Sequence, residues 1–125
     1  MKSTLKFSTV FVMSLFFLIA SCSTEYSVKI NKDTYAPGEI IKIEYTADPN
    51  WNESAWIGII PSSVAHGKEA ENDANDIYYE YLKNSDKGTL EFLAPTEPGK
   101  YDIRMHDTDD AETGLEISSV TFTVE

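Results

Sequence analysis

Hydrophobic and polar residues alternate with a period of two along most of the chain beyond its first segment. In one such stretch Ile41, Ile43 and Tyr45 share a face, whereas Lys42 and Glu44 take the opposite face. This alternation is typical of a β-strand with one buried face. The same pattern predicts further core faces at Leu90 and Phe92, at Tyr101, Ile103 and Met105, and at Val120, Phe122 and Val124.

Turn signals divide the pattern into short strands. Each signal combines proline or glycine with a polar neighbour, at Pro37-Gly38, Asp48-Pro49-Asn50, Asp86-Lys87-Gly88 and Pro98-Gly99. We therefore predict seven strands, near residues 26–31, 39–47, 55–60, 77–82, 88–94, 100–107 and 116–124. Short strands at this density indicate an all-β fold, an immunoglobulin-like two-sheet antiparallel sandwich over residues 26–125.

One connection is much longer than a turn. Residues 61–76 separate the third and fourth predicted strands, although such connections usually have about four to six residues. The segment is acidic, with Glu69, Glu71, Asp73 and Asp76, and residues 68–74 can form one or two helical turns. Because charged runs normally face water, we favour a solvated excursion that covers a sheet edge over a binding loop.

The first residues have the build of a secretory signal peptide. Lys2 and Lys6 precede an apolar run from Val10 to Ala20. The run ends in Ile19-Ala20-Ser21-Cys22, which resembles the bacterial lipobox, whose cysteine is acylated and becomes the first residue after cleavage. We expect residues 1–21 to be removed, Cys22 to carry acyl chains such as palmitate, and residues 22–25 to form a lipidated tether.

Lipidation would anchor the protein in the bacterial cell envelope, since each buried CH2 group contributes about 0.8 kcal/mol. Ser23, rather than aspartate, follows the cysteine, which favours the outer membrane in enteric-type sorting. No second apolar stretch is long enough to span a bilayer, so the lipid is the expected membrane attachment. Cys22 is the single cysteine, so no intrachain disulfide is expected.

The charge balance excludes one class of partner. The chain has 10 Lys and Arg residues against 21 Asp and Glu residues, a formal net charge of -11. The leader carries two of the lysines and no acidic residue, so the acidity belongs to the predicted domain. Nucleic acids are bound through clustered Lys and Arg residues, and we therefore expect no nucleic-acid partner.

Four short motifs follow one another along the predicted domain. They are Tyr35-Ala36-Pro37-Gly38-Glu39, Trp56-Ile57-Gly58-Ile59, Gly88-Thr89-Leu90-Glu91-Phe92 and Pro98-Gly99-Lys100-Tyr101-Asp102-Ile103-Arg104. Their order and rough spacing, over residues 28–124, resemble a bacterial immunoglobulin-like module similar to the SKICH-type sandwich. Such modules are mostly non-catalytic parts of secreted enzymes or interaction domains, so the resemblance implies binding or structural work. The resemblance does not indicate which ligand is bound.

Three residues of these motifs have predicted structural roles. Trp56, in the third predicted strand, is expected between the two sheets, as is the core tryptophan of immunoglobulin-like domains. Gly58 would let the opposing sheet approach closely. Tyr101, near the start of the sixth predicted strand, resembles a tyrosine corner whose hydroxyl group bonds to nearby backbone.

A search for catalytic residues finds little. His66 lies in the long connection, and His106 is followed directly by Asp107. Adjacent residues of a strand point to opposite faces, so His106 and Asp107 cannot pair as a base and its orienting group without a bulge. No nucleophile elbow, zinc-binding helix or phosphate-binding glycine loop is present. We therefore expect no enzyme activity and assign no catalytic residue.

Aromatic residues offer candidate partner-binding positions. Tyr79 and Tyr81 share one face of the fourth predicted strand, whereas Tyr78 takes the other. An exposed face would carry amphipathic rings of the kind that recognise sugars or partner proteins. We take Tyr79 and Tyr81, with Trp51 in the preceding loop, as the candidates. The alternative is that one face is core and the other is ordinary edge-strand surface.

Two acidic loops are predicted at the same end of the sandwich, at residues 48–54 and 107–114. They bring together five candidate calcium ligands, which are Asp48, Glu53, Asp107, Asp109 and Asp110. Carboxylate oxygens in this number suit calcium, which takes about six to eight of them. The spacing differs from that of an EF-hand, and the alternative is a pair of splayed, solvated loops.

These observations predict a non-catalytic, lipid-anchored binding or interaction module of the cell envelope. Its partners would be the membrane, through the anchor, and an envelope protein or glycan. No cofactor is expected apart from calcium. Two alternatives stay open, a calcium-dependent binding domain and a small envelope inhibitor or immunity-type lipoprotein. An exposed tyrosine pair would support the binding module, and a bound metal ion would support the calcium-dependent domain.

Overall fold

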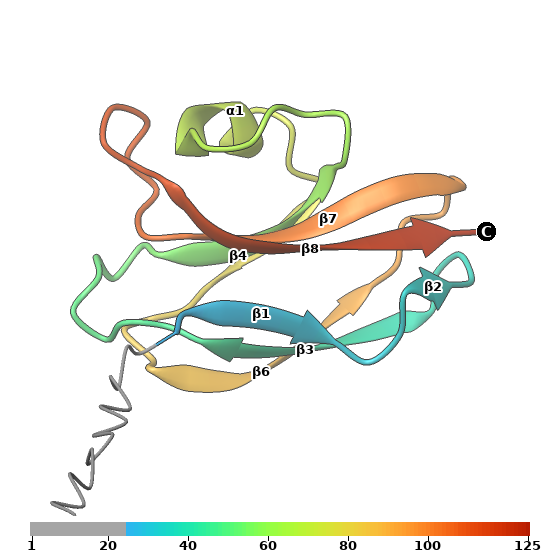
Figure 1. Cartoon of the computed structure of the whole chain (residues 1–125), viewed down its shortest axis with the longest axis horizontal. Coiled ribbons are helices and arrows are strands. Elements are labelled where there is room, and N and C mark those ends of the chain that lie inside the picture. The colour runs from blue at the N-terminus through green and yellow to red at the C-terminus, as the bar shows by residue number, and fades with distance from the viewer. Residues whose placement is uncertain (1–24) are drawn as a thin grey trace, which may run out of the picture.

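The chain folds as a sandwich of two β-sheets (Figure 1). The computed structural model describes residues 25–125, so the predicted leader and the lipidation site at Cys22 lie outside the described residues. Within residues 25–125, no helix has the length and apolar character needed to cross a membrane. The two-sheet arrangement confirms the all-β sandwich predicted from the alternating pattern.

One sheet has three antiparallel strands in the order β1-β3-β6. Its strands are β1 (Ser27–Ile30), β3 (Ile40–Thr46) and β6 (Lys87–Leu93). In the centre of the sheet Ile43 pairs with Ile30 on one side and with Leu90 on the other.

The second sheet has five strands in the order β2-β8-β7-β4-β5. Its strands are β2 (Thr34–Tyr35), β4 (Trp56–Pro61), β5 (Tyr78–Tyr81), β7 (Gly99–His106) and β8 (Glu116–Val124). All neighbours are antiparallel except β2 and β8, which run parallel. The strand β5 therefore forms one edge of this sheet, beside β4.

The topology is immunoglobulin-like, because β1, β3 and β6 form one sheet whereas β4, β7 and β8 lie together in the other. Each of the seven predicted strands is present, with its ends within one residue of the prediction. The pattern missed β2, since two residues are too few to show an alternation. Its residue Tyr35 is nevertheless buried in the core.

The hydrophobic core lies between the two sheets. Ile41, Ile43 and Phe92 enter it from the three-stranded sheet, and Ile103 and Met105 enter it from β7. These five side chains are at most 1% exposed, which confirms the predicted core faces at these positions. Leu90 and Val120 are only partly buried and pack against the core from its border.

Tyr101 forms the predicted tyrosine corner. Its hydroxyl group donates a hydrogen bond to the backbone oxygen of Glu97, at 2.7 Å, and its ring stacks on Phe122 at 5.8 Å. The bond joins the start of β7 to the turn that precedes it, so the prediction for this residue is confirmed.

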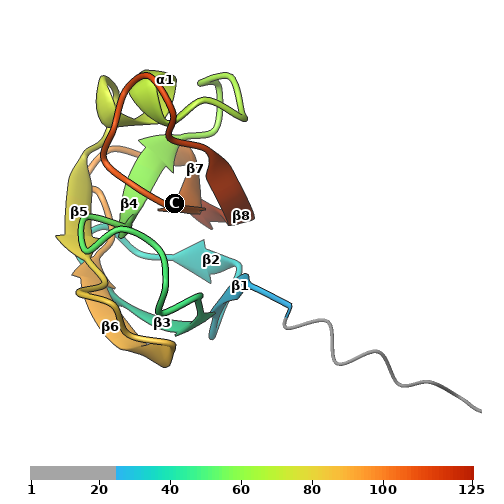
Figure 2. The same cartoon turned by 90° about the vertical axis from the view of Figure 1, so that its left-hand side faces the viewer.

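The long connection forms a third layer. It contains the helix α1 (Glu69–Asp73), within the segment predicted to be helical. Figures 1 and 2 show α1 on the outer side of the five-stranded sheet, away from β1, β3 and β6. The connection thus covers a face of this sheet rather than its edge, so the expected position was wrong. Its residues other than Glu69 and Asn72 are exposed or partly exposed, which agrees with the expectation of a solvated segment.

Candidate functional site

Trp56 lies on the outer face of the five-stranded sheet, beneath α1, and not between the sheets as predicted. Along β4 the side chains of Ile57 and Ile59 enter the inner core, and the alternation of a strand turns Trp56 to the opposite side. It is 1% exposed, and its ring stacks on His106 with centroids 3.8 Å apart. The residue is buried as expected, but in a different layer.

Gly58 makes room for the ring of Trp56 rather than for the opposing sheet. A β-carbon at this position would lie 2.6 Å from Cζ3 of Trp56 and 2.9 Å from the backbone oxygen of Tyr78. Both distances are far below van der Waals contact, so the outer layer requires glycine here. The predicted role in sheet approach was therefore wrong.

A buried ion pair lies beside Trp56. The guanidinium group of Arg104 is fully buried, and its Nη2 is 2.7 Å from Oδ2 of Asp102. Ser62 and Thr121 donate hydrogen bonds of 2.7 and 2.8 Å to the other oxygen of Asp102. Burial alone would raise the pKa of Asp102, but these donors and Arg104 hold that pKa below its usual range.

Asn72, on α1, connects the helix to the sheet. Its side-chain oxygen accepts a hydrogen bond of 2.6 Å from Arg104, and its Nδ2 donates to Glu116 at 3.0 Å. The same Nδ2 lies 2.8 Å from Nε2 of His106. Burial lowers the pKa of His106 to about 4, so the ring is neutral and accepts this bond at Nε2. All hydrogen-bonding groups of the Asn72 amide are therefore used.

Neither His66 nor His106 is arranged as a general base with a carboxylate that orients it. His106 is fully buried, while Asp107 accepts a bond from the backbone of Leu115 through Oδ1 at 2.9 Å. The ladder between β7 and β8 is irregular at His106, yet this does not bring the two side chains into a base and orienter arrangement. His66 is half exposed and lies between Glu116 and Asp102, at 2.7 and 3.4 Å.

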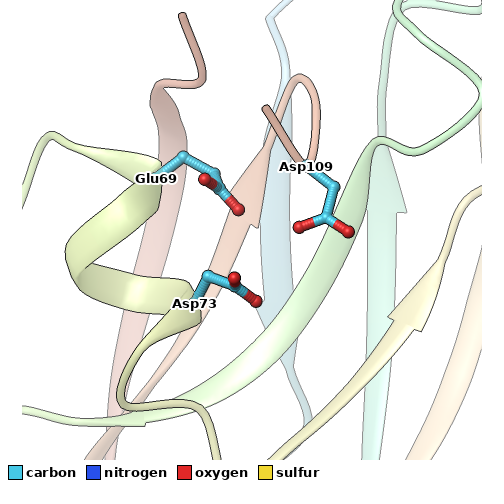
Figure 3. A group of neighbouring side chains, drawn as sticks. All are labelled: Glu69, Asp73 and Asp109. Atoms are coloured by element: carbon cyan, nitrogen blue, oxygen red, sulfur yellow. The ribbon is translucent and has the colours of Figure 1, made fainter. Parts of the chain in front are cut away.

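Three carboxylates meet at the end of this outer layer (Figure 3). One oxygen from each of Glu69, Asp73 and Asp109 lies within 4.8 Å of the others. Glu69 is fully buried, and its Oε1 accepts a hydrogen bond of 3.1 Å from Nε1 of Trp56. Its Oε2 is also buried but has no hydrogen-bond partner. Such an atom is costly to bury without a proton or a cation.

The local sequence explains how the three side chains converge. Glu69 and Asp73 are four residues apart on α1, so they lie on the same face of the helix. Gly114 lets the loop after β7 approach, since a β-carbon there would lie 2.5 Å from the β-carbon of Glu69. The backbone nitrogen of Glu69 donates to the oxygen of Gly114 at 3.1 Å. This contact holds the loop, and with it Asp109, against the helix.

The pKa of Glu69 is raised to about 7, first by burial and then by its interaction with Asp109. Burial also raises the pKa of Asp73, and the charge of Asp109 adds to this effect. The cause in both cases is the same. Negative charge is gathered in a partly desolvated place, and no basic side chain of residues 25–125 forms an ion pair with it.

The predicted calcium ligands do not come together as a set. The two acidic loops do lie side by side, since the backbone nitrogen of Asp109 donates to Oγ of Ser54 at 3.3 Å. However, Asp48, Asp107 and Asp110 each accept backbone hydrogen bonds within their own loops. In residues 25–125, the group of metal-ligating side chains within reach of one ion contains Asp109 alone of the predicted five. The predicted composition of the site, including Glu53, was therefore wrong.

The two candidate tyrosines lie together on the outer face of β5. Tyr79 and Tyr81 are 46% and 39% exposed, and their ring centroids are 5.3 Å apart. Tyr79 also contacts the edge of Trp56 at 6.1 Å. The hydroxyl group of Tyr81 donates a bond of 2.7 Å to Oδ2 of Asp109, which raises the pKa of Tyr81. The tyrosine pair therefore borders the carboxylate cluster directly.

The other two aromatic residues lie elsewhere. Tyr78 is on the opposite face of β5, where its ring contacts Phe92 at 4.9 Å. Trp51 is partly buried at the border of the inner core, and its ring contacts Tyr26 at 4.8 Å. The structure thus gives Trp51 a packing role and does not join it to the tyrosine pair.

Sequence reasoning missed Glu69, Asn72, Asp73 and Arg104 as members of one layer. Two signals were present. Along β7 the polar residues Asp102, Arg104 and His106 alternate with core residues. Such a strand buries its apolar face, and another part of the chain can cover its polar face. Glu69 and Asp73 have the spacing of one helical face. Neither signal alone says that the connection folds back onto this sheet.

Comparison with known proteins adds no constraint. No model of a protein family matches the chain, and no curated protein matches it either.

Proposed function

We propose that this chain is a lipid-anchored, non-catalytic binding module of the bacterial cell envelope that recognises glycans through Tyr79 and Tyr81. The leader and the lipobox-like sequence ending at Cys22 support the anchor and the address. The resemblance of the domain to SKICH-type modules supports a binding role. The exposed tyrosine pair on the edge strand β5 is the observation that carries the proposal.

The pair has the properties of a recognition surface. Exposed aromatic rings combine a large apolar area with a polar group, and two rings cost little conformational entropy when they are held in place. Here Tyr79 rests against buried Trp56, and Tyr81 is held by its bond to Asp109. A shallow depression beside Tyr81 is lined by Glu53, Ser54, Tyr81, Lys83 and Asn84. It offers hydrogen-bonding groups next to the ring.

A glycan fits this surface better than a protein does. Sugar rings stack on aromatic faces and bond to carboxylates and amides at their rim, and a neutral sugar is not repelled by an acidic domain. A stable protein interface buries about 1,200 to 2,000 Å2 and centres on a continuous apolar patch. The third exposed tyrosine of β5, Tyr78, faces the other side of the sheet, so the pair is not part of a larger aromatic patch on one face.

The tether places the ligand close to the membrane. Only residues 23–26 separate Cys22 from the first strand, and such a segment spans about 14 Å at full extension. Tyr26 donates a hydrogen bond of 2.9 Å to Asp48, in the loop that packs against the loop of Asp109. The tyrosine pair is therefore at the tethered end of the domain, within reach of glycans at the membrane surface.

The non-catalytic part of the proposal is supported by the position of His106. Its ring is fully buried, stacks on Trp56 and is bonded to Asn72, so His106 is not accessible to a substrate as a general base. The anchor is tested by Cys22→Ser. We expect this variant to leave the membrane fraction for the soluble envelope fraction, and unchanged partitioning would contradict lipidation.

Binding is tested with the full chain held in a polyoxyethylene-ether detergent, which contains no sugar. The probes are neutral oligosaccharides of N-acetylglucosamine, titrated by calorimetry, with deacylated lipopolysaccharide oligosaccharides as an anionic comparison that the acidic domain should bind more weakly. We expect Tyr79→Ala and Tyr81→Ala each to weaken binding by about tenfold, since truncating an aromatic residue at the centre of a binding surface typically costs more than about 1 kcal/mol.

Tyr78→Ala is the matched control, because it removes an equally exposed ring from the other face of the same strand. It should bind as the wild type does. Equal losses in all three variants, or no binding of any glycan probe, would contradict the proposal. Crosslinking of the wild type to an envelope protein that Tyr79→Ala abolishes would favour a protein partner instead.

A further inference from the structure

We propose that Glu69, Asp73 and Asp109 bind a hard divalent cation, with calcium preferred, at the end of the outer layer. Figure 3 shows the three carboxylates pointing toward one another, two from α1 and one from the loop between β7 and β8. One oxygen of each lies within 4.8 Å of the others. Three oxygens this close together can share one ion after small side-chain movements, since calcium contacts its ligands at about 2.3 to 2.6 Å.

A cluster of acidic residues on a surface can be solvated without an ion, but Glu69 is not on the surface. It is fully buried, and its Oε2 has no hydrogen-bond partner. Its carboxyl group points into the cluster (Figure 3). Its other oxygen already accepts the bond from Trp56. Burying an unpaired carboxylate oxygen is strongly unfavourable unless a proton or a cation is supplied. A cation can reach the cluster from solvent, because the side chains of Asp73 and Asp109 are exposed.

The surrounding charges also favour a cation. Among residues 25–125, the ion pairs involve Asp102, Glu116 and Glu39 as acidic partners and none of the three clustered residues. A fourth carboxylate, Asp76, is near enough that the charges of Asp73 and Asp109 raise its pKa beyond the effect of its burial. Arg104, the buried cation of this layer, is committed to Asp102. The negative charge of the cluster is therefore uncompensated by protein groups.

The chemistry of the ligands selects the class of ion. All three offer carboxylate oxygens, which suit calcium, magnesium and manganese, and the cluster contains no sulfur and no imidazole to favour zinc or copper. Calcium accepts bidentate carboxylates and irregular geometry, whereas magnesium demands a near-ideal octahedron. Ligands from a short helix and a loop suit the more tolerant ion.

The site would touch the proposed recognition surface without depending on it. The hydroxyl group of Tyr81 donates a hydrogen bond to Oδ2 of Asp109. The other oxygen of this carboxylate, Oδ1, is then available to the ion, so Tyr81 and the ion can contact Asp109 from two sides. Cation binding needs no glycan, and failure of either proposal is measured separately. The ring of Tyr81 would be more firmly oriented when the ion is bound.

The test uses the full chain in polyoxyethylene-ether detergent, first stripped with chelator and then titrated with calcium chloride. Extracellular calcium modules bind at about 0.1 to 1 mM, so about 10 mM calcium should raise the melting temperature by at least about 5 °C. The fluorescence of Trp56 should change with the same midpoint, because its indole N–H is bonded to a ligand of the ion. Choline chloride at equal ionic strength controls for general screening.

Three isosteric variants locate the ion. Glu69→Gln keeps an acceptor for Trp56, and Asp73→Asn and Asp109→Asn keep the volume of the side chains, so each should fold. Each should lose the calcium shift and bind calcium at least tenfold more weakly. Glu71→Gln removes an exposed carboxylate from the same helix and should keep the full shift.

Two results would overturn the proposal. The first is the absence of any calcium shift in the wild type beyond that of choline, which would mean that a proton shared with Asp109 satisfies Glu69. The second is a shift that survives in Asp73→Asn and Asp109→Asn, which would place the ion elsewhere. Tyr81→Phe should keep calcium binding, and this result separates the ion site from the glycan surface.

Discussion

The two faces of strand β7 are both buried but have opposite chemistry. Along β7 the inner face presents Ile103 and Met105, whereas the outer face presents Asp102, Arg104 and His106. The inner face is covered by the three-stranded sheet and the outer face by the connection that contains α1. One strand thus belongs to an apolar core and to a polar one.

The difference between the apolar and the polar face explains how the candidate site is positioned. Apolar contacts are non-directional and tolerate exchange of similar side chains. The outer layer instead consists of matched donors and acceptors, with Asn72 bonded to Arg104 and close to His106. Such bonds allow one placement of α1 on the sheet, and this placement brings Glu69 and Asp73 to Asp109. The polar face therefore determines where the carboxylates lie.

Breaking the outer layer at its centre should have the largest effect. Arg104→Ala leaves Asp102 buried without its cation, and we expect a loss of about 3 to 5 kcal/mol in the free energy of unfolding, measured by urea denaturation. The double variant Arg104→Met with Asp102→Asn removes both charges and should lose clearly less than Arg104→Ala. Equal losses would mean that the ion pair is not the cause.

At Ile103, on the inner face of β7, the loss of stability should depend only on the volume of the side chain removed. Ile103→Ala creates a cavity between the sheets, and we expect a loss of about 3 kcal/mol, whereas Ile103→Val should cost about 1 kcal/mol. Urea denaturation of both variants measures the two losses. A loss that did not scale with the volume removed would contradict the assignment of Ile103 to a purely apolar core.

His106 should make stability depend on pH. Its pKa is lowered by burial to about 4, against about 6.5 in an unfolded chain. The unfolded state therefore binds the proton first as the pH falls, and the histidine contributes a loss of stability between pH 6.5 and pH 4. The loss is on the order of 2 to 3 kcal/mol, at about 1.36 kcal/mol per pKa unit.

The raised pKa of Glu69 acts in the opposite direction. Its native state keeps a proton from pH 4.5 to about 7, so this residue stabilises the fold as the pH falls through that range. The histidine effect must therefore be measured as a difference, by urea denaturation of His106→Phe and wild type at several pH values. The variant should gain relative stability toward pH 4. A constant difference would contradict a buried, neutral His106.

The smallest expected effect is at the tyrosine corner. Tyr101→Phe removes the hydrogen bond to Glu97 and keeps the ring on Phe122, so we expect a loss of about 1 kcal/mol. Thermal melts at neutral pH would measure it. A loss as large as that of Arg104→Ala would contradict the expectation that the tyrosine corner contributes less to stability than the buried ion pair does.

The sequence by itself determined the strands and the inner core of this protein. A strand places alternate residues on opposite faces, so the period of two in segments such as Ile41, Ile43 and Tyr45 is readable without any tertiary information. The tyrosine corner was readable for a related reason, since Tyr101 and Glu97 are close along the chain. Local geometry decides both features.

Only the tertiary structure decided what covers the outer face. Whether Trp56 lies inside or outside the sandwich depends on which face of β4 meets the other sheet, and both faces of this strand are apolar enough to be buried. The carboxylate cluster predicted from loops at one end of the sandwich shares Asp109 with the cluster in the structure, whereas the other members differ. The partners, Glu69 and Asp73, are far from Asp109 in sequence. They meet it because hydrogen bonds of buried polar groups, which no periodicity encodes, hold the helix against the sheet.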